Sequence, residues 1–401
     1  MNSKKRIWRV LGILLSSLLL EVVFAGYILA APKRLKIGVI LPISGPISTV
    51  GMSLARGFEL FFDKVNEKGG VKIGNEQYLF DFILEDEKMS PEAAAIAAKK
   101  LVHKDGAKFV FGAILDASTE AIYQVCAPSK VLHLVFWVNV PWHPADVNPK
   151  KPLAVRLAVS PHDPQASDYD YLIKTYPNVK KVVISAPDIG YEGMIEKCKA
   201  LAKKLGVEVI AVEKWPIGTT DFIPVFTKIL AHKPDAIHAM ISGQAMYQLR
   251  AARQLGFKGP FFSDSPLGPD VILRVAGPEA STDVFCNGMD LGNATEAMRD
   301  VMKRWQAKYK EEFVSDAFLG WDEAWILTQA MEKAKSVDPG KVLATLETMT
   351  KPGSLQTVFG PGHMGGLKSF GVNRVLVRPI PLSRIMNGKI EFVKFIVPDV
   401  P

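Results

Sequence analysis

The residue types that most often carry out chemistry are few and scattered in this chain of 401 residues. Its three cysteines lie far apart and lack the C-x-x-C or Cys/His spacing of zinc and redox sites. The seven histidines are dispersed, and neither a G-x-S-x-G nor an H-E-x-x-H motif occurs. Asp116 with His143 or His162 is the one candidate nucleophile–base pair, and no spacing supports it. The sequence therefore predicts no enzyme, no metal site and no cofactor.

Nucleotide and nucleic-acid sites also lack support. No G-x-G-x-x-G follows the first apolar run, which argues against a dinucleotide site. In the glycine cluster at 360–366 no Gly is followed directly by a Lys-Ser/Thr pair, and no helix is predicted behind it, so we interpret it as a turn-rich crossover rather than a P-loop. Lys and Arg are scattered among Asp and Glu within a net charge of +8. We expect no nucleic-acid partner, because no basic block is present.

Small polar and aromatic residues instead gather in the segments that follow short apolar runs. Ligands of open α/β sheets bind beyond the carboxyl ends of the strands, and such residues suit a binding cleft for a small solute. The candidate ligand-binding residues are Ser44, Thr49, Val50, Asp116, Ala117, Ser118, Trp137, Asn139, Tyr191, Ser242, Asp264 and Ser265.

The elements that would position these loops follow from hydrophobic patterning. Short apolar runs alternate with amphipathic stretches from residue 33 onward, which is typical of parallel, doubly wound sheets. The predicted strands are 36–43, 80–84, 108–113, 131–138, 155–159, 179–186, 207–212 and 236–241. The predicted helices are 51–67, one opened by Ser90-Pro91-Glu92, one from about 117, then 191–205, 222–231 and 245–255. The chain thus contains two similar α/β halves in tandem.

The last hundred residues break this alternation. Helices are predicted at 294–313, 318–334 and 342–349. Two β segments follow at 367–378 and 389–397, the second reached through the turn dipeptide Asn387-Gly388. A tail of helices and then strands after two α/β units implies several crossings between two lobes.

The pattern of residues 1–31 is typical of an export signal. Four basic residues precede an apolar run that starts at Val10, and small residues at Ala25 and at Ala31 offer two cleavage sites. The alternative is an uncleaved anchor, because the whole stretch is just long enough to span a bilayer, although Glu21 in its middle argues against that. Removal of residues 1–31 would leave a net charge of about +5.

A set of ordered fragments resembles a known family. The fragments are KIGVILPISGP from Lys36, Gly51 with Gly57, NEKGG from Asn66, Asp86 followed by SPEAAA from Ser90, FVFG from Phe109 with Ser118-Thr119, DIGYEG from Asp188, DFIP from Asp221, LAHKPDA from Leu230, and QLRAARQLGF from Gln248. Each fragment alone is weak, but in this order they resemble the type I periplasmic solute-binding proteins of ABC transporters, in the branched-chain amino-acid and amide group. The resemblance runs from about Lys36 to the C-terminus.

The resemblance implies two doubly wound Rossmann-like lobes joined by three crossovers. We expect a signal peptide at 1–31, an N-terminal lobe of 32–156 plus 286–358, and a C-terminal lobe of 157–285 plus 359–401. It also implies a monomeric periplasmic protein that closes on a small solute and docks on a membrane permease. The alternative is a ligand-sensing ectodomain tethered by an uncleaved N-terminal helix.

The family's amino-acid site is altered in this chain. The hydroxyl that holds the ligand carboxylate in the family falls on Asp116, whose charge would repel a carboxylate. Trp137 and Asn139 replace a run of small residues, the acidic second-lobe position falls near Ser265 with Asp264 beside it, and Val50 replaces an aromatic. These departures argue against a simple branched-chain amino acid and admit an amide, a urea-like solute, a cationic solute or an aromatic ligand. The expected solute is therefore an amino acid of another kind, an amide or an aromatic acid.

Structural interpretations of the same residues remain open. Asp116 could be the N-cap of the helix that follows it, and Ser118 and Thr119 could bond within that helix. Trp321 and Trp325 are four apart on a helix and are interpreted as core rather than as a ligand stack. One disulfide among Cys126, Cys198 and Cys286 is feasible after export, but buried free thiols are the commoner case for such apolar segments.

Overall fold

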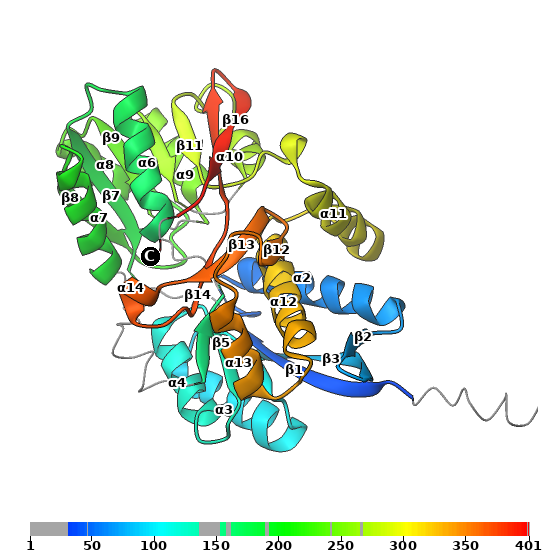
Figure 1. Cartoon of the computed structure of the whole chain (residues 1–401). Helices are drawn as coiled ribbons and strands as arrows, with labels where there is room; N and C mark the ends of the chain where they lie inside the picture. Colours follow the sequence, from blue (N-terminus) through cyan, green and yellow to red (C-terminus); the bar gives the residue numbers. More distant parts are fainter. Residues whose placement is uncertain are drawn as a thin grey trace, which may run out of the picture.

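The protein folds into two lobes, each built on one sheet (Figure 1). The structure is a computed structural model that describes residues 31–45, 47–135, 153–157, 162–188, 192–240, 243–264, 268–398 and 400. None of the helices in these ranges is long and apolar enough to cross a membrane. The predicted α/β architecture of two doubly wound lobes is confirmed.

The first sheet has nine strands and a parallel centre. Its order is β12 (Leu355–Thr357), β13 (Gly360–Gly365), β14 (Val375–Val377), β6 (Ala154–Arg156), β5 (Leu132–Val135), β4 (Phe109–Phe111), β1 (Lys33–Leu41), β3 (Glu76–Asp86) and β2 (Val71–Ile73). The strands from β14 to β3 run parallel, whereas β2, β13 and β12 pair antiparallel at the two edges. Each central strand therefore delivers its carboxyl end to one edge of the sheet.

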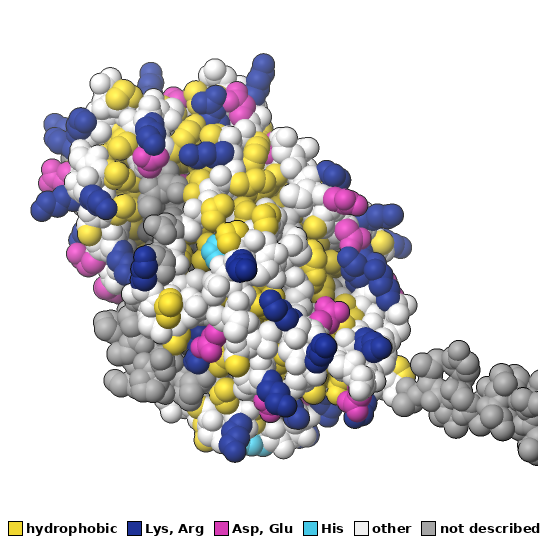
Figure 2. All heavy atoms as spheres, viewed as in Figure 1, with side chains coloured by type: hydrophobic (Ala, Val, Ile, Leu, Met, Phe, Trp, Pro, Cys, Tyr) yellow, Lys and Arg dark blue, Asp and Glu magenta, His cyan; other side chains and the backbone are white. Residues whose placement is uncertain are grey.

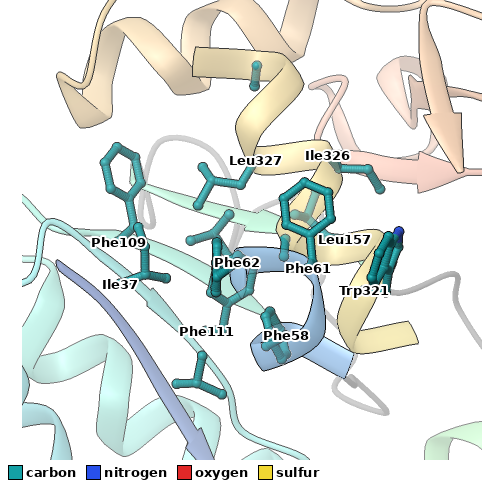
Figure 3. Packing of buried hydrophobic residues seen from close by; sticks show 14 of the residues in the cluster. Ile37, Phe58, Phe61, Phe62, Phe109, Phe111, Leu157, Trp321, Ile326 and Leu327 are labelled. Carbon is teal, nitrogen blue, oxygen red and sulfur yellow. The ribbon is translucent and has the colours of Figure 1, made fainter. Parts of the chain in front are cut away.

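Helices from both ends of the chain cover this sheet. They are α2 (Ser48–Glu67), α3 (Pro91–Lys99) with the short π-helix η1 (Lys100–Asp105), α4 (Asp116–Cys126), α11 (Glu296–Tyr309), α12 (Ala317–Ala334), α13 (Pro339–Thr348) and the short α14 (Leu367–Phe370). Helix α3 begins as predicted: the Ser90 side chain accepts a hydrogen bond from the N–H of Ala93 (3.3 Å), and Pro91 occupies the first turn. Figure 3 shows the main core, where Phe58, Phe62 and Phe111 from α2 and β4 meet Trp321 and Leu327 of α12.

The second lobe has a seven-stranded sheet. Its order is β16 (Lys389–Ile396), β15 (Ile380–Met386), β11 (Val284–Cys286), β10 (Phe261–Ser263), β9 (Ala236–Ala239), β7 (Lys181–Pro187) and β8 (Glu208–Trp215). Its helices are α6 (His162–Thr175), α7 (Glu192–Lys204), α8 (Ile223–Ala231), α9 (Ala245–Gln254) and α10 (Pro269–Ala276). The hairpin of β15 and β16 turns at Asn387-Gly388, as predicted, with positive φ at both residues.

The C-terminal region differs from the prediction in three ways. Strands β12 to β14 belong to the first sheet, so the expected lobe boundary at 358/359 is wrong and the chain crosses after Val377 instead. The segment 360–366 is mostly strand β13 rather than a turn-rich crossover, and Leu367–Phe370 is a short helix rather than β. Strand β13 is hydrogen-bonded to β12 and β14, which explains why it forms a strand in the first sheet. The glycine-rich composition of 360–366 does not reveal these distant partners.

The third crossover carries a buried charge. Arg378 lies between β14 and β15, donates from Nη1 to the carbonyl of Pro379 (3.0 Å) and stacks on Phe359 with its guanidinium carbon 4.0 Å from the ring centroid. Its Nε lies 3.7 Å from Oδ2 of Asp322 on α12. Burial lowers the pKa of Arg378 to about 10, although the carboxyls of Asp322 and Glu323 oppose that shift.

Two glycines let α2 sit unusually close to its neighbours. A Cβ at Gly51 would lie 2.1 Å from the carbonyl oxygen of Pro42, in the loop after β1. A Cβ at Gly57 would lie 2.1 Å from the carbonyl oxygen of Ala317, and Gly320 of α12 approaches Leu54 equally closely. Gly51 and Gly57, which form one of the fragments that carry the family resemblance, thus have a packing role, because no larger residue fits at either position without a shift of the backbone.

The three cysteines are free and buried, as the apolar segments around them indicated. Burial raises the pKa of Cys126 and of Cys286 to about 12, which keeps both thiols protonated at neutral pH.

On the face of the molecule shown in Figure 2, Lys and Arg side chains are interspersed with Asp and Glu side chains, and no large patch of one sign is seen.

Gly57→Ala is expected to destabilise the fold by roughly 2 kcal/mol or more, because its methyl group cannot avoid backbone atoms of α12. Gly193→Ala is the matched control, since Gly193 lies in α7 and a Cβ there meets nothing within 4 Å; we expect it to be neutral or slightly stabilising. Urea unfolding of both variants measures the difference. Equal stability of the two variants would contradict the close-packing argument.

Candidate functional site

Three strands of the first lobe deliver polar residues to the same sheet edge. Ser44 follows β1, Asp86 ends β3 and Asp116 opens the helix after β4. Because β3, β1 and β4 are parallel neighbours, these positions share the carboxyl edge where ligands of this architecture bind. Thr49 and Val50 start α2 beside Ser44, with Thr49 exposed and Val50 half-buried against the core.

Asp86 organises the loop that carries Ser44. Its Oδ2 accepts a hydrogen bond from Ser44 Oγ (2.6 Å), and its Oδ1 accepts from the N–H groups of Lys88 (2.9 Å) and Ile43 (3.2 Å). Burial alone would raise the pKa of Asp86, but these hydrogen bonds outweigh it and the net shift is downward. Asp86 is therefore a charged structural anchor, and Ser44 is engaged with it.

The first turn of α4 is the second part of this edge. The helix begins at Asp116 with Leu115 as N-cap, so Asp116 is the first helical residue and not the cap. Thr119 donates its hydroxyl to the carbonyl of Leu115 (2.9 Å), which confirms a bond within the helix, whereas the buried Ser118 Oγ has no hydrogen-bond partner. Ala117 is exposed.

Glu87, which follows the anchor Asp86, was missed by the sequence analysis. Its side chain is buried (0% exposed), and Oε1 accepts a 3.3 Å hydrogen bond from the N–H of Ile114, in the loop before α4. Its Oε2 has no partner, and the Ser118 hydroxyl lies beside the carboxyl. Burial raises the pKa of Glu87 to about 7, and the Ser118 hydroxyl and the Ile114 N–H offset only part of that rise.

The second lobe carries its own buried polar cluster. Asp264 follows β10, and its Oδ2 lies 3.3 Å from Nε2 of His238 on β9. The other ring nitrogen of His238 lies 3.3 Å from the hydroxyl of Tyr169 on α6. Asp264 is therefore turned into the lobe, with its side chain fully buried.

Two more residues extend this cluster along the sheet edge. Asn287, next to β11, donates from Nδ2 to Oδ1 of Asp168 on α6 (3.0 Å). Burial, and then the negative charge of Asp264, raise the pKa of Asp168 well above its usual value. Asp168 and its neighbour Tyr169 are both buried on α6, but the surrounding segment 165–171 is mostly polar, so the sequence carries no signal that could have revealed Asp168.

The remaining candidates lie outside the described residues. The structure brings Ser44, Thr49 and Val50 together in one loop and helix start, and Asp116, Ala117 and Ser118 on the adjacent connection, while Asp264 lies on the other sheet. The candidates outside the described residues are Trp137, Asn139, Tyr191, Ser242 and Ser265. In the described ranges, no group of three His, Cys, Asp or Glu side chains could hold a metal ion.

A hollow of about 240 Å³ occurs elsewhere, between α2, α11 and α12. Phe61, Trp321 and Trp325 form its apolar wall, and Lys64 bridges to Asp300 at 2.8 Å. No candidate ligand residue lines it. Trp321 is only 2% exposed and belongs to the main core, with Trp325 packed against it, as the helical spacing of the two residues predicted.

Comparison with known proteins identifies the family to which this chain belongs. The family model described as periplasmic binding protein matches residues 34–388, across both lobes. The chain belongs to the periplasmic binding protein family. It is similar to the Leu/Ile/Val-binding protein homolog 3 of Brucella melitensis biotype 1, with 24% identity over 353 residues, 86% of this chain and 91% of that protein.

Solved structures of solute-binding proteins share the fold. The branched-chain amino acid transporter substrate binding protein of Streptococcus pneumoniae, in complex with isoleucine, matches with a TM-score of 0.74 and 20% identity over 91% of this chain and all of that one. An ABC transporter solute binding protein of R. palustris, in complex with benzoate, matches with a TM-score of 0.72 and 19% identity over 91% and 97% of the two chains. The type I periplasmic binding fold expected for the chain is thus confirmed.

Glu87→Gln is expected to stabilise this periplasmic binding protein at pH 8 but not at pH 5. An acid with a raised folded-state pKa destabilises the fold as pH rises from its unfolded value of 4.5 through about 7, because the unfolded state then holds fewer protons than the folded state. The gain at pH 8 should approach roughly 3 kcal/mol, which is several degrees of Tm. Thermal unfolding at the two pH values measures it.

Asp86→Asn is the matched control, because the pKa of Asp86 is lowered instead. Its stabilising effect is present above the unfolded pKa of 3.8 and is lost as pH falls through the folded pKa. The variant should therefore lose stability at both pH 5 and pH 8. A Tm gain for Glu87→Gln that is equal at pH 5 and pH 8 would contradict the assignment of Glu87.

Proposed function

We propose that the chain is the extracytoplasmic solute-binding component of an ABC importer. It captures one small solute between its lobes, closes, and delivers the solute to a membrane permease. The observation that carries this proposal is the family match across both lobes, 34–388, together with a fold shared with solute-binding proteins of known ligand. The chain acts as a binding protein and not as an enzyme.

The polar edge of the first lobe supports a small solute that bears a carboxylate. Helices α2 and α4 both begin at this edge, and helix N-termini favour anionic groups, which at α4 must outweigh the opposing charge of Asp116 at its first position. The structural neighbours named above carry isoleucine and benzoate, both of which are carboxylates. The replacement of small residues by Trp137 and Asn139 favours an aromatic acid over a branched-chain amino acid, with an amide as the remaining option.

Export through the N-terminal segment completes the proposal. The basic start and apolar run of residues 1–31 match an export signal, and cleavage would release a free periplasmic monomer. The mass of the chain recovered from the periplasm tests this step. Cleavage near Ala25 or Ala31 supports the importer component, whereas a retained segment supports the tethered sensor.

Solute binding is tested by thermal unfolding of residues 32–401 against benzoate, hydroxybenzoates, aliphatic and aromatic amino acids, amides, urea and polyamines. A solute at a hundred times its Kd should stabilise the chain by about 2.7 kcal/mol, which is a Tm shift of several degrees. We expect the largest shifts with aromatic carboxylates. No shift with any compound of this panel would contradict the proposal.

A charge placed on α4 tests where the carboxylate is held. Ala117→Glu adds a negative charge to the exposed first turn, and it should weaken carboxylate binding about tenfold or more. Gln124→Glu adds the same charge to the same helix about 10 Å farther along its axis, where screening should limit the effect to about twofold. Calorimetric Kd values measure both. Equal losses in the two variants would contradict an anion site at the start of α4.

A further inference from the structure

Glu87 places an acid directly behind the edge where a ligand carboxylate is expected. Its carboxyl is held against the loop before α4 by the Ile114 N–H (3.3 Å) and lies beside Ser118 in the first turn of that helix. Both side chains are fully buried, and Glu87 Oε2 lacks a well-placed hydrogen-bond donor. A buried acceptor without a donor is costly, and a proton on Oε2 removes the charge that makes it so.

Within the described part of the chain, no cation contributes to the pKa of Glu87. Asp86, the charged neighbour that acts on it, disfavours its ionised form. On the packed elements, α4 contributes Asp116 at its first position, and β5 contributes His133, whose Nε2 contacts the carbonyl of Gly112. Helix α3 begins with Glu92, which is engaged with Ser90.

We propose that Glu87 is a specificity-determining residue whose protonation is coupled to the ligand: a carboxylate solute held at the start of α4 stabilises the protonated form of Glu87. The inference rests on the proposed function and adds how the protonation state of Glu87 would select a carboxylate solute. The proton comes from solvent and stays on the Glu87 carboxyl, so no bond of the solute is made or broken. When Glu87 is neutral, the positive end of the α4 dipole attracts the ligand carboxylate. When Glu87 is ionised, its own negative charge repels that carboxylate.

The sign of the pH dependence follows from linkage. The pKa of Glu87 is about 7 without ligand, so the neutral form is half populated near neutrality. An anion nearby favours the protonated form and raises that pKa further, by about one unit or more at a separation of several ångströms. Affinity for a carboxylate should therefore be constant well below pH 7 and should fall as pH rises above it.

The test measures Kd by calorimetry at constant ionic strength from about pH 6 to pH 8.5, with benzoate and isoleucine as carboxylate probes and benzamide as the uncharged control. In the unmutated chain, the Kd of the bound carboxylate should rise about fivefold or more over this range. In Glu87→Gln, which is neutral at every pH, that Kd should be flat. Benzamide binding, where present, should be flat in both proteins.

Proton uptake gives a second readout on the same samples. At about pH 8, titrations in two buffers of different ionisation enthalpy should show about half a proton or more taken up per carboxylate bound by the unmutated chain, and none by Glu87→Gln. Should Glu87→Gln fail to fold, infrared difference spectra of the unmutated chain still decide, because ligand binding at that pH should add a protonated carboxyl band.

The outcomes separate this inference from the proposed function. Carboxylate binding with a flat Kd, or a pH dependence that persists in Glu87→Gln, overturns the role of Glu87 and leaves the importer component intact. Binding of benzamide but of no carboxylate also overturns it and points to an uncharged solute. A chain that binds no solute of the panel at any pH loses both the proposed function and this inference.

Discussion

The close contact of α2 with its neighbours is the constraint on which the first lobe depends. Gly51 brings the helix start against the carbonyl of Pro42, and Gly57 brings its middle against the carbonyl of Ala317. The first contact fixes the β1–α2 loop at the sheet edge, and the second joins the beginning of the chain to α12, which lies far along the sequence. Aromatic packing around Phe58 and Trp321 follows from this approach, since dense cores tolerate little displacement (Figure 3). The position of the β1–α2 loop at the sheet edge thus depends on the absence of a side chain at Gly51 and at Gly57.

The same edge shows how two adjacent acids acquire opposite properties. Asp86 and Glu87 are neighbours in sequence, but the strand end turns them in different directions. Asp86 meets the Ser44 hydroxyl and two backbone N–H groups, so its charged form is favoured, whereas Glu87 meets one long N–H bond and an unpaired hydroxyl in a dry interior. Local donor supply, rather than residue type, therefore decides which acid anchors the loop and which one can exchange a proton near neutral pH.

Much of the fold was predictable because burial imposes a period on the sequence. The runs at 36–43 and 179–186, the start of α3 at Ser90 and the Asn387-Gly388 turn were recovered from local chemistry. The segment 360–366 was not, because its strand depends on ladder partners distant in the chain and its composition suggests a turn. Glu87 and Asp168 were missed for a related reason: the sequence shows a charged residue, and only the tertiary structure shows that it is buried without a countercharge.

A buried charge lies where the chain passes between the lobes after β14. Arg378 is held by the Pro379 carbonyl, by the ring of Phe359 and by Asp322 of α12, all within the interior. Removing one partner would leave an uncompensated charge, and proline restricts the backbone at the same place, so the third crossover is stiff. Under the proposed function, selection would depend on the groups that each sheet edge already holds, with Glu87 behind one edge and Asp168 and Asp264 behind the other.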